Sequence, residues 1–251
     1  MIDRRSVCLG TAAAMAAGTV VYAEPDKPLF ASGPLAGNFL AASFKTPPAS
    51  VVLPDTPLLS AHGPQRLSQL RGRNYIVSLW AEWCAPCLEE ATDLAMISRT
   101  RSGPSLGVIF VLTSSDKKLD VAGAQAVLAK RDAGDVTLFV EANGGKAVMN
   151  ALATQDYDAQ WRAIYKKARG SSLPCNLLVD RHGRVRGRSF GAPGMTQTLA
   201  PAGTKPGETI ITATPMTEAD KERALKEHTM WATSIGSQFI TALAAGILEK
   251  A

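Results

Sequence analysis

Cys84 and Cys87 lie three positions apart in this chain, with Pro86 between them. They close the segment Trp80-Ala81-Glu82-Trp83-Cys84-Ala85-Pro86-Cys87, which follows an apolar run over residues 75–79. Two thiols at this spacing can bind a metal ion, form a structural disulfide, or exchange electrons with another thiol pair. The rest of the sequence distinguishes between these three kinds of chemistry.

Metal binding and a purely structural disulfide are both poorly supported by the sequence. A structural zinc site needs four ligands, usually supplied by a second cysteine pair or a histidine pair. His62, His182 and His228 are the three histidines, and they are scattered without ligand spacing. A disulfide that closes so short a loop constrains the unfolded chain little. The sequence therefore favours a redox pair that needs no metal and no organic cofactor.

The predicted elements around the pair explain how the two thiols would react. An apolar strand over residues 75–81 runs into a helical pattern that begins at Cys84. At the N-terminus of a helix, free backbone N–H groups and the helix dipole stabilise a thiolate, so Cys84 is expected to attack the substrate. Cys87, one turn further on the same face, is expected to resolve the mixed disulfide. Pro86 is tolerated because backbone N–H groups in the first turn of a helix have no acceptor within the helix. The N–H that proline lacks therefore costs no hydrogen bond there.

Alternating strand and helix patterns predict an α/β protein with a central mixed sheet flanked by helices. Besides the strand before Cys84, apolar runs predict strands over 107–113, 136–140, 176–179 and 184–189. The last two form a hairpin, which adds antiparallel strands. Helical patterns occupy 84–99, 121–131, 146–153 and 157–167.

The C-terminal part of the chain predicts a helical extension. Residues 192–215 are rich in Pro, Gly and Thr, with a short strand predicted over 209–213, and a helix is predicted from Thr217 onward. An apolar residue then recurs every four positions, at Trp231, Ile235, Phe239, Leu243 and Ile247. We interpret this stripe as packing against the sheet rather than against a membrane surface.

The N-terminal residues 1–23 have the features of a secretory leader. Arg4 and Arg5 precede a weakly apolar stretch, and small residues precede a predicted cleavage after Ala23. The leader predicts a periplasmic protein, with an uncleaved inner-membrane anchor as the alternative. Residues 24–50, rich in Pro, Ala, Gly and Ser, predict a flexible lead-in before a folded domain over 51–251.

Composition and charge exclude several other classes of protein. The chain is 46% hydrophobic and 20% charged, which is typical of a globular protein rather than a disordered one. Its net charge of +5 is mild, and the basic residues are interspersed with acidic ones along the chain. The sequence therefore predicts no nucleic-acid partner.

The segment from Trp80 to Cys87 resembles the active-site segment of thioredoxins. The wider chain, over residues 51–191, resembles the exported TlpA/ResA-type thiol-disulfide oxidoreductases, including those that serve cytochrome c maturation. Three further stretches carry this resemblance: 67–73 before the active-site strand, 136–140 in the central insertion, and 173–185 in the proline loop and the strand that follows.

The resemblance implies a thioredoxin-like fold. The chain departs from the family by a helical insertion over about 154–170 and by a C-terminal extension over about 192–251. It implies that Pro174 is a cis-proline beside the nucleophilic cysteine and that the backbone of Leu173 docks the substrate. Trp83 and Pro86 are expected to form the substrate-binding surface next to the nucleophile. Glu90 matches the active-site glutamate of the family and is expected to handle the proton of Cys87.

The chain departs from the family pattern at three positions. Ser78 stands where thioredoxins have a buried aspartate, and Thr92 stands where the family often has a proline. Cys175 directly follows Pro174. We interpret Cys175 as a buried strand cysteine, with a third redox thiol or a metal ligand as the alternatives.

Together these features predict a thiol-disulfide oxidoreductase of the cell envelope that reduces protein disulfides or carries electrons, for example in cytochrome c maturation or metal-centre assembly. Its expected partners are protein thiols and disulfides, together with a membrane or periplasmic electron donor. The membrane itself is a partner only if the leader is retained. The alternative is a copper-binding module on the same fold, with Cys84, Cys87 and Cys175 as ligands.

Overall fold

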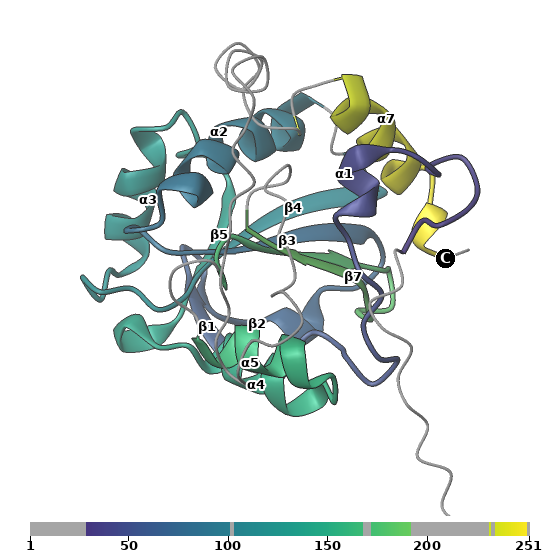
Figure 1. Ribbon diagram of the computed structural model, residues 1–251. Coiled ribbons are helices and arrows are strands. Elements are labelled where there is room, and N and C mark those ends of the chain that lie inside the picture. The colour runs from purple at the N-terminus through teal and green to yellow at the C-terminus, as the bar shows by residue number, and fades with distance from the viewer. Residues whose placement is uncertain (1–28, 101–102, 168–171, 192–230, 232–233, 250–251) are drawn as a thin grey trace, which may run out of the picture.

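The computed structural model describes residues 29–100, 103–167, 172–191, 231 and 234–249. A seven-stranded sheet runs through the molecule in the order β2-β1-β5-β4-β3-β6-β7 (Figure 1). The strands are β1 (Pro57–Ser60), β2 (Gly63–Arg66), β3 (Asn74–Trp80), β4 (Leu106–Leu112), β5 (Thr137–Val140), β6 (Cys175–Val179) and β7 (Val185–Phe190). The α-helices are α1 (Phe39–Ala42), α2 (Ala85–Thr100), α3 (Val121–Ala129), α4 (Ala147–Gln155), α5 (Ala159–Lys167) and α7 (Ser234–Ala244). Short 3-10 turns lie at Leu67–Gln69, Ala142–Gly144 and Ile247–Glu249.

The sheet is mixed, as the sequence predicts. β3 pairs in parallel with β4 on one side and antiparallel with β6 on the other. All positions of β3 and β4 are buried, because each strand has a neighbour on both sides and helices cover both faces of the sheet. This architecture is the thioredoxin-like fold that the resemblance implies.

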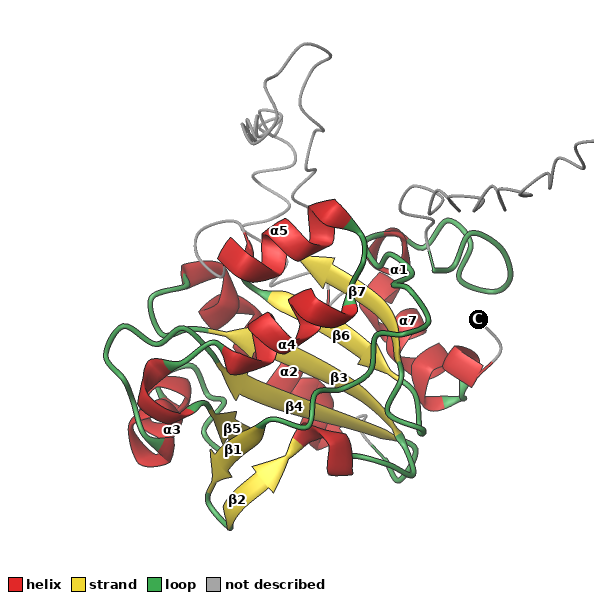
Figure 2. Cartoon of the chain, turned by 90° about the horizontal axis from the view of Figure 1, so that it is seen from below, coloured by secondary structure: helices red, strands yellow, loops and turns green. Residues whose placement is uncertain are grey.

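Helices form a layer on each face of the sheet. Figures 1 and 2 show α1, α2 and α7 on one face, and α4 and α5 on the other. The helices predicted over 146–153 and 157–167 are α4 and α5. Within the described part of the chain, no helix is long and apolar enough to cross a membrane.

Residues 29–50 are folded, so the prediction of a flexible lead-in is wrong for this described part of the segment. Phe30, Leu40 and Phe44 are buried, and the rings of Phe30 and Phe44 lie 5.7 and 5.5 Å from the ring of Phe239 in α7. Lys45 adds a β-bridge to Arg188 at the edge of the sheet. The apolar residues among the Pro, Gly and Ser positions therefore decide the structure of this segment, because they complete the core against α7.

The C-terminal stripe packs against the core, as predicted. Trp231, Phe239 and Leu243 are buried. The Asn74 side chain of β3 donates a hydrogen bond to the carbonyl oxygen of Leu243 at 3.0 Å, which fixes α7 against the sheet. The leader, the strand predicted over 209–213 and the first part of the helix predicted from Thr217 lie outside the described residues.

The hairpin of β1 and β2 was not predicted from the sequence. Its strands Pro57–Ser60 and Gly63–Arg66 contain a proline each and show little apolar alternation. β2 forms one edge of the sheet, where a proline is tolerated because no neighbouring strand needs its N–H.

Candidate active site

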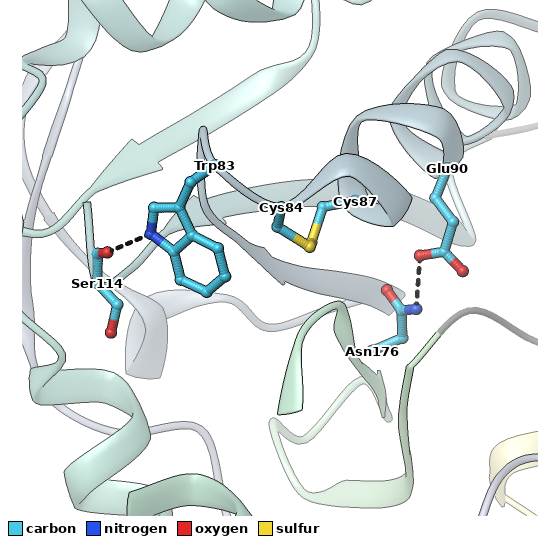
Figure 3. The surroundings of a disulfide bond; sticks show 6 residues. All are labelled: Trp83, Cys84, Cys87, Glu90, Ser114 and Asn176. Atoms are coloured by element: carbon cyan, nitrogen blue, oxygen red, sulfur yellow. Dashed lines mark hydrogen bonds between the residues drawn. A yellow bond between two sulfur atoms is a disulfide. The ribbon is translucent and has the colours of Figure 1, made fainter. Parts of the chain in front are cut away.

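The junction of β3 and α2 places the two cysteines at the start of a helix. Cys84 and Cys87 form a disulfide, with their Cα atoms 5.3 Å apart (Figure 3). α2 begins at Ala85, and the carbonyl oxygen of Cys84 accepts the hydrogen bond of the Leu88 amide at 3.2 Å. Cys84 is therefore the residue that caps α2, at the position where the helix dipole acts most strongly on a thiolate.

The two cysteines do not differ in exposure. In the disulfide form, Cys84 is 4% exposed and Cys87 is 3% exposed. The bond holds both sulfur atoms together, so exposure does not distinguish them. Their position does, because Cys84 precedes the first turn of α2 and Cys87 lies within it.

Trp83 lies beside the disulfide and is fixed by a hydrogen bond. Its indole N–H donates to the carbonyl oxygen of Ser114 at 2.9 Å, in the loop that follows β4 (Figure 3). Trp83 and Pro86 are both half-buried, and Ala85 between the cysteines is exposed. The surface around the disulfide is therefore apolar and partly accessible.

The Leu173–Pro174 peptide bond is cis, in agreement with the resemblance. Pro174 directly precedes β6, whose first residue, Cys175, pairs with Leu79 of the strand that leads into the cysteines. The proline loop and the active-site strand are therefore neighbours in the sheet. The Leu173 side chain is buried.

Glu90 is a buried carboxyl group on α2. The residue is 1% exposed and lies on α2 three positions after Cys87. Its Oε2 accepts a hydrogen bond from the Asn176 side chain at 3.0 Å, and its Oε1 accepts one from the indole N–H of Trp231 at 3.1 Å. Figure 3 shows Glu90 and the disulfide on the same side of α2.

The environment of Glu90 raises its pKa to about 7. The main cause is burial, which disfavours the charged form. The hydrogen bonds from Asn176 and Trp231 lower the pKa, and the nearby charge of Asp93 raises it. A carboxyl group in this range can both take up and release a proton near neutral pH.

The register of β3 and β6 connects Ser78 to Glu90 through Asn176. Ser78 is buried and pairs directly with Asn176. Asn176 in turn donates its hydrogen bond to Glu90. The carboxyl group of this site therefore comes from the helix, and the two strand positions that face it are neutral.

Cys175 is a buried strand cysteine, as interpreted from the sequence. It is fully buried, and burial raises the pKa of its thiol to about 12, while the charge of Arg188 acts in the opposite direction. Because side chains alternate along β6, Cys175 points to the face opposite that of Asn176. The described residues contain no group of three His, Cys, Asp or Glu side chains that could hold a metal ion. The three cysteines of the copper-binding alternative are therefore not brought together.

Two residues of the site, Asn176 and Trp231, were missed by sequence reasoning. Asn176 opened a predicted strand, and a lone amide in a buried apolar strand was the signal that could have revealed it. Trp231 was assigned to the core stripe. Nothing in its spacing indicates that the polar edge of its ring reaches α2.

The Redoxin family model matches residues 47–202 of the chain. A putative thiol:disulfide interchange protein DsbE from Chlorobium tepidum has 22% identity, covers 57% of this chain and 86% of its own, and has a TM-score of 0.40. A thiol:disulfide interchange protein from Bacteroides sp. has 16% identity, covers 58% and 82%, and has a TM-score of 0.42. A secreted disulfide oxidoreductase of Mycobacterium tuberculosis has 16% identity, covers 53% and 81%, and has a TM-score of 0.36.

The family match spans the cysteine pair, the cis-proline and all strands of the sheet. The chain belongs to the Redoxin family, and its enzyme class is that of the thiol-disulfide oxidoreductases.

Proposed function

We propose that the protein reduces disulfides of other proteins through the Cys84/Cys87 pair, with Glu90 as the group that handles the proton of Cys87. The observation that carries this proposal is a disulfide at the N-terminus of α2 with a buried carboxyl group one helical turn beyond it. Trp83, Pro86, Leu173 and Pro174 are proposed to bind the substrate, since they belong to the segments next to the disulfide.

The electrostatics of the site favour a reductant over an oxidant. Strong disulfide oxidants are those whose reduced thiolate is stabilised. Here the helix dipole stabilises a thiolate on Cys84, but the carboxyl group of Glu90, when ionised, disfavours a second negative charge nearby. The dithiol is therefore expected to give up its electrons more readily than one without this carboxylate.

The reaction proceeds in two exchange steps. The thiolate of Cys84 attacks one sulfur of the substrate disulfide, and the other substrate sulfur leaves as a thiolate. Cys87 then gives its proton to the carboxylate of Glu90 and attacks the sulfur of Cys84. The mixed disulfide breaks, the Cys84–Cys87 disulfide forms, and the second substrate sulfur leaves. Two electrons pass to the substrate, whose thiolates are protonated by Glu90 and by water.

A separate electron donor must reduce the Cys84–Cys87 disulfide after each turnover. The predicted leader over residues 1–23 supports a periplasmic location, where a membrane or periplasmic dithiol would serve as that donor. We propose that the chain is of the TlpA/ResA type, because residues 67–73, 136–140 and 173–185 resemble segments of those proteins. A role in cytochrome c maturation or metal-centre assembly fits such a reductant.

Insulin reduction tests the proposed activity. With a small dithiol as electron source, the wild-type protein is expected to accelerate the reduction of insulin, followed as the turbidity of the released chains. Cys175→Ala is the control, because this thiol is buried and points away from Glu90; it should retain the activity. A rate no higher than that of the small dithiol alone would rule out the proposed function.

A further inference from the structure

The two oxygen atoms of the Glu90 carboxyl group each have a hydrogen-bond donor from a different part of the chain. Asn176 of β6 reaches Oε2, and Trp231, close before α7, reaches Oε1. An indole N–H can only donate a hydrogen bond. Trp231 therefore interacts with Glu90 as a donor, and this interaction is stronger with a carboxylate than with a neutral carboxyl group.

The ring of Trp231 is held in place by two other aromatic side chains. It is buried, with its centroid 6.2 Å from that of Phe44 and 6.2 Å from that of Phe239. Phe44 belongs to the N-terminal segment and Phe239 to α7. The N–H group of the indole thus has a fixed direction, set by packing rather than by Glu90 itself.

Trp231 and Asn176 donate the hydrogen bonds that favour the charged form of Glu90. Among the described residues, Asp93, one turn further along α2, is the titratable group whose charge acts on Glu90, and it raises the pKa. Ser78 and Ser189 flank Asn176 in the sheet and are neutral. α7 contains no titratable residue. Burial and Asp93 therefore act in one direction, and the two hydrogen bonds act in the other.

We propose that Trp231 is a positioning residue of the redox site, whose indole N–H holds the carboxyl group of Glu90 and sets its proton affinity. This inference rests on the proposed function in one respect, which is the role of Glu90 in handling the proton of Cys87. Its consequence is that the C-terminal segment, 141 positions away in the sequence, adjusts the pH range in which the dithiol exchanges its proton. Without this donor, the carboxylate would be less stable and its pKa would rise further.

The oxidised protein allows the pairing to be observed directly. Cys84 and Cys87 do not titrate while they form a disulfide. In an NMR titration of the oxidised full chain, the indole N–H resonance of Trp231 should therefore shift with the same midpoint as the side-chain carboxyl carbon of Glu90, near pH 7. Glu90→Gln identifies the carboxyl resonance and should abolish the titration of the indole.

Trp231→Phe removes the donor and keeps an aromatic ring between Phe44 and Phe239. The midpoint of Glu90 is expected to rise by about one pH unit, because a hydrogen bond to a charged group is lost from a buried site. Trp161→Phe is the matched control: this buried tryptophan packs against Phe190 on the other face of the sheet and should leave the midpoint unchanged.

Two results would overturn the inference. One is an indole resonance of Trp231 that does not follow the titration of Glu90 in the wild-type protein, a test that stands even if Trp231→Phe does not fold. The other is a folded Trp231→Phe variant with the wild-type midpoint. Neither result depends on insulin reduction, so a failure of the proposed function would be seen separately.

Discussion

Cys84→Ser is expected to abolish disulfide reduction, with a loss on the order of a thousand-fold or more, because it removes the attacking nucleophile. Cys87→Ser is expected to retain the first exchange step and to accumulate a mixed disulfide with the substrate. Cys84 caps α2, and Cys87 lies in the first turn of this helix. Removing Cys87 therefore takes away the resolving thiol and leaves the nucleophile in place.

Non-reducing gels and peptide mass spectrometry distinguish the two variants. The reduced Cys87→Ser protein, mixed with a protein disulfide, should yield a covalent complex joined through Cys84. Cys84→Ser should yield none, and Cys175→Ala should behave as the wild type. A complex that forms in Cys84→Ser through Cys87 would reverse the roles assigned to the two thiols.

Arg188→Ala is expected to destabilise the protein by about 3–5 kcal/mol, because it leaves a buried carboxylate without its cation. Arg188 of β7 is 1% exposed and forms an ion pair with Asp156, which is fully buried at its side chain. Its guanidinium group also lies 4.2 Å from the ring centroid of Trp161 in α5, and 3.6 Å from Asp158. This cluster of Arg188, Asp156, Asp158 and Trp161 ties α4 and α5 to the sheet.

Urea denaturation measures the loss, with Arg66→Ala as the control. Arg66 and Asp55 form an ion pair whose side chains are 46% and 68% exposed, so its removal should cost less than about 1 kcal/mol. The pKa of Asp156 is raised by burial and lowered by Arg188. The destabilisation of Arg188→Ala should therefore be larger at neutral than at acidic pH, since Asp156 can be protonated in acid.

Equal losses of stability in Arg188→Ala and Arg66→Ala would show that the buried Arg188–Asp156 ion pair does not stabilise the protein as proposed. A double variant, Arg188→Met with Asp156→Leu, provides a second test. Because it removes both buried charges, it should recover part of the stability that Arg188→Ala loses.

The sequence predicted the centre of the fold better than its margins. The runs over 75–81 and 107–113 are almost entirely apolar because β3 and β4 are covered on both faces, and this pattern is visible without the structure. The fold of residues 29–50 is not visible in the sequence, because their few apolar side chains are spaced among Pro, Gly and Ser. Their partner, α7, lies almost 200 positions away, as the hydrogen bond from Asn38 to Ile235 shows.

The chemistry of the site was predictable only where it depends on local sequence. The spacing of Cys84 and Cys87 and the strand before them predicted a disulfide at a helix N-terminus. The burial of Glu90 was not predictable, because its hydrogen-bond partners, Asn176 and Trp231, are 86 and 141 positions away. Local patterns carry no information about contacts that the sheet and α7 bring together.

The reduction potential of the Cys84–Cys87 disulfide tests the central claim most directly. It can be measured by equilibrating the protein with glutathione or dithiothreitol redox buffers and counting the free thiols by alkylation. Glu90→Gln serves as the comparison, and its potential should be higher because the charge that disfavours the thiolate is gone. If the protein is a reductant, the wild-type reduction potential should lie below about −200 mV, closer to that of thioredoxin at about −270 mV. A value near about −120 mV, typical of a strong disulfide oxidant, would contradict the account.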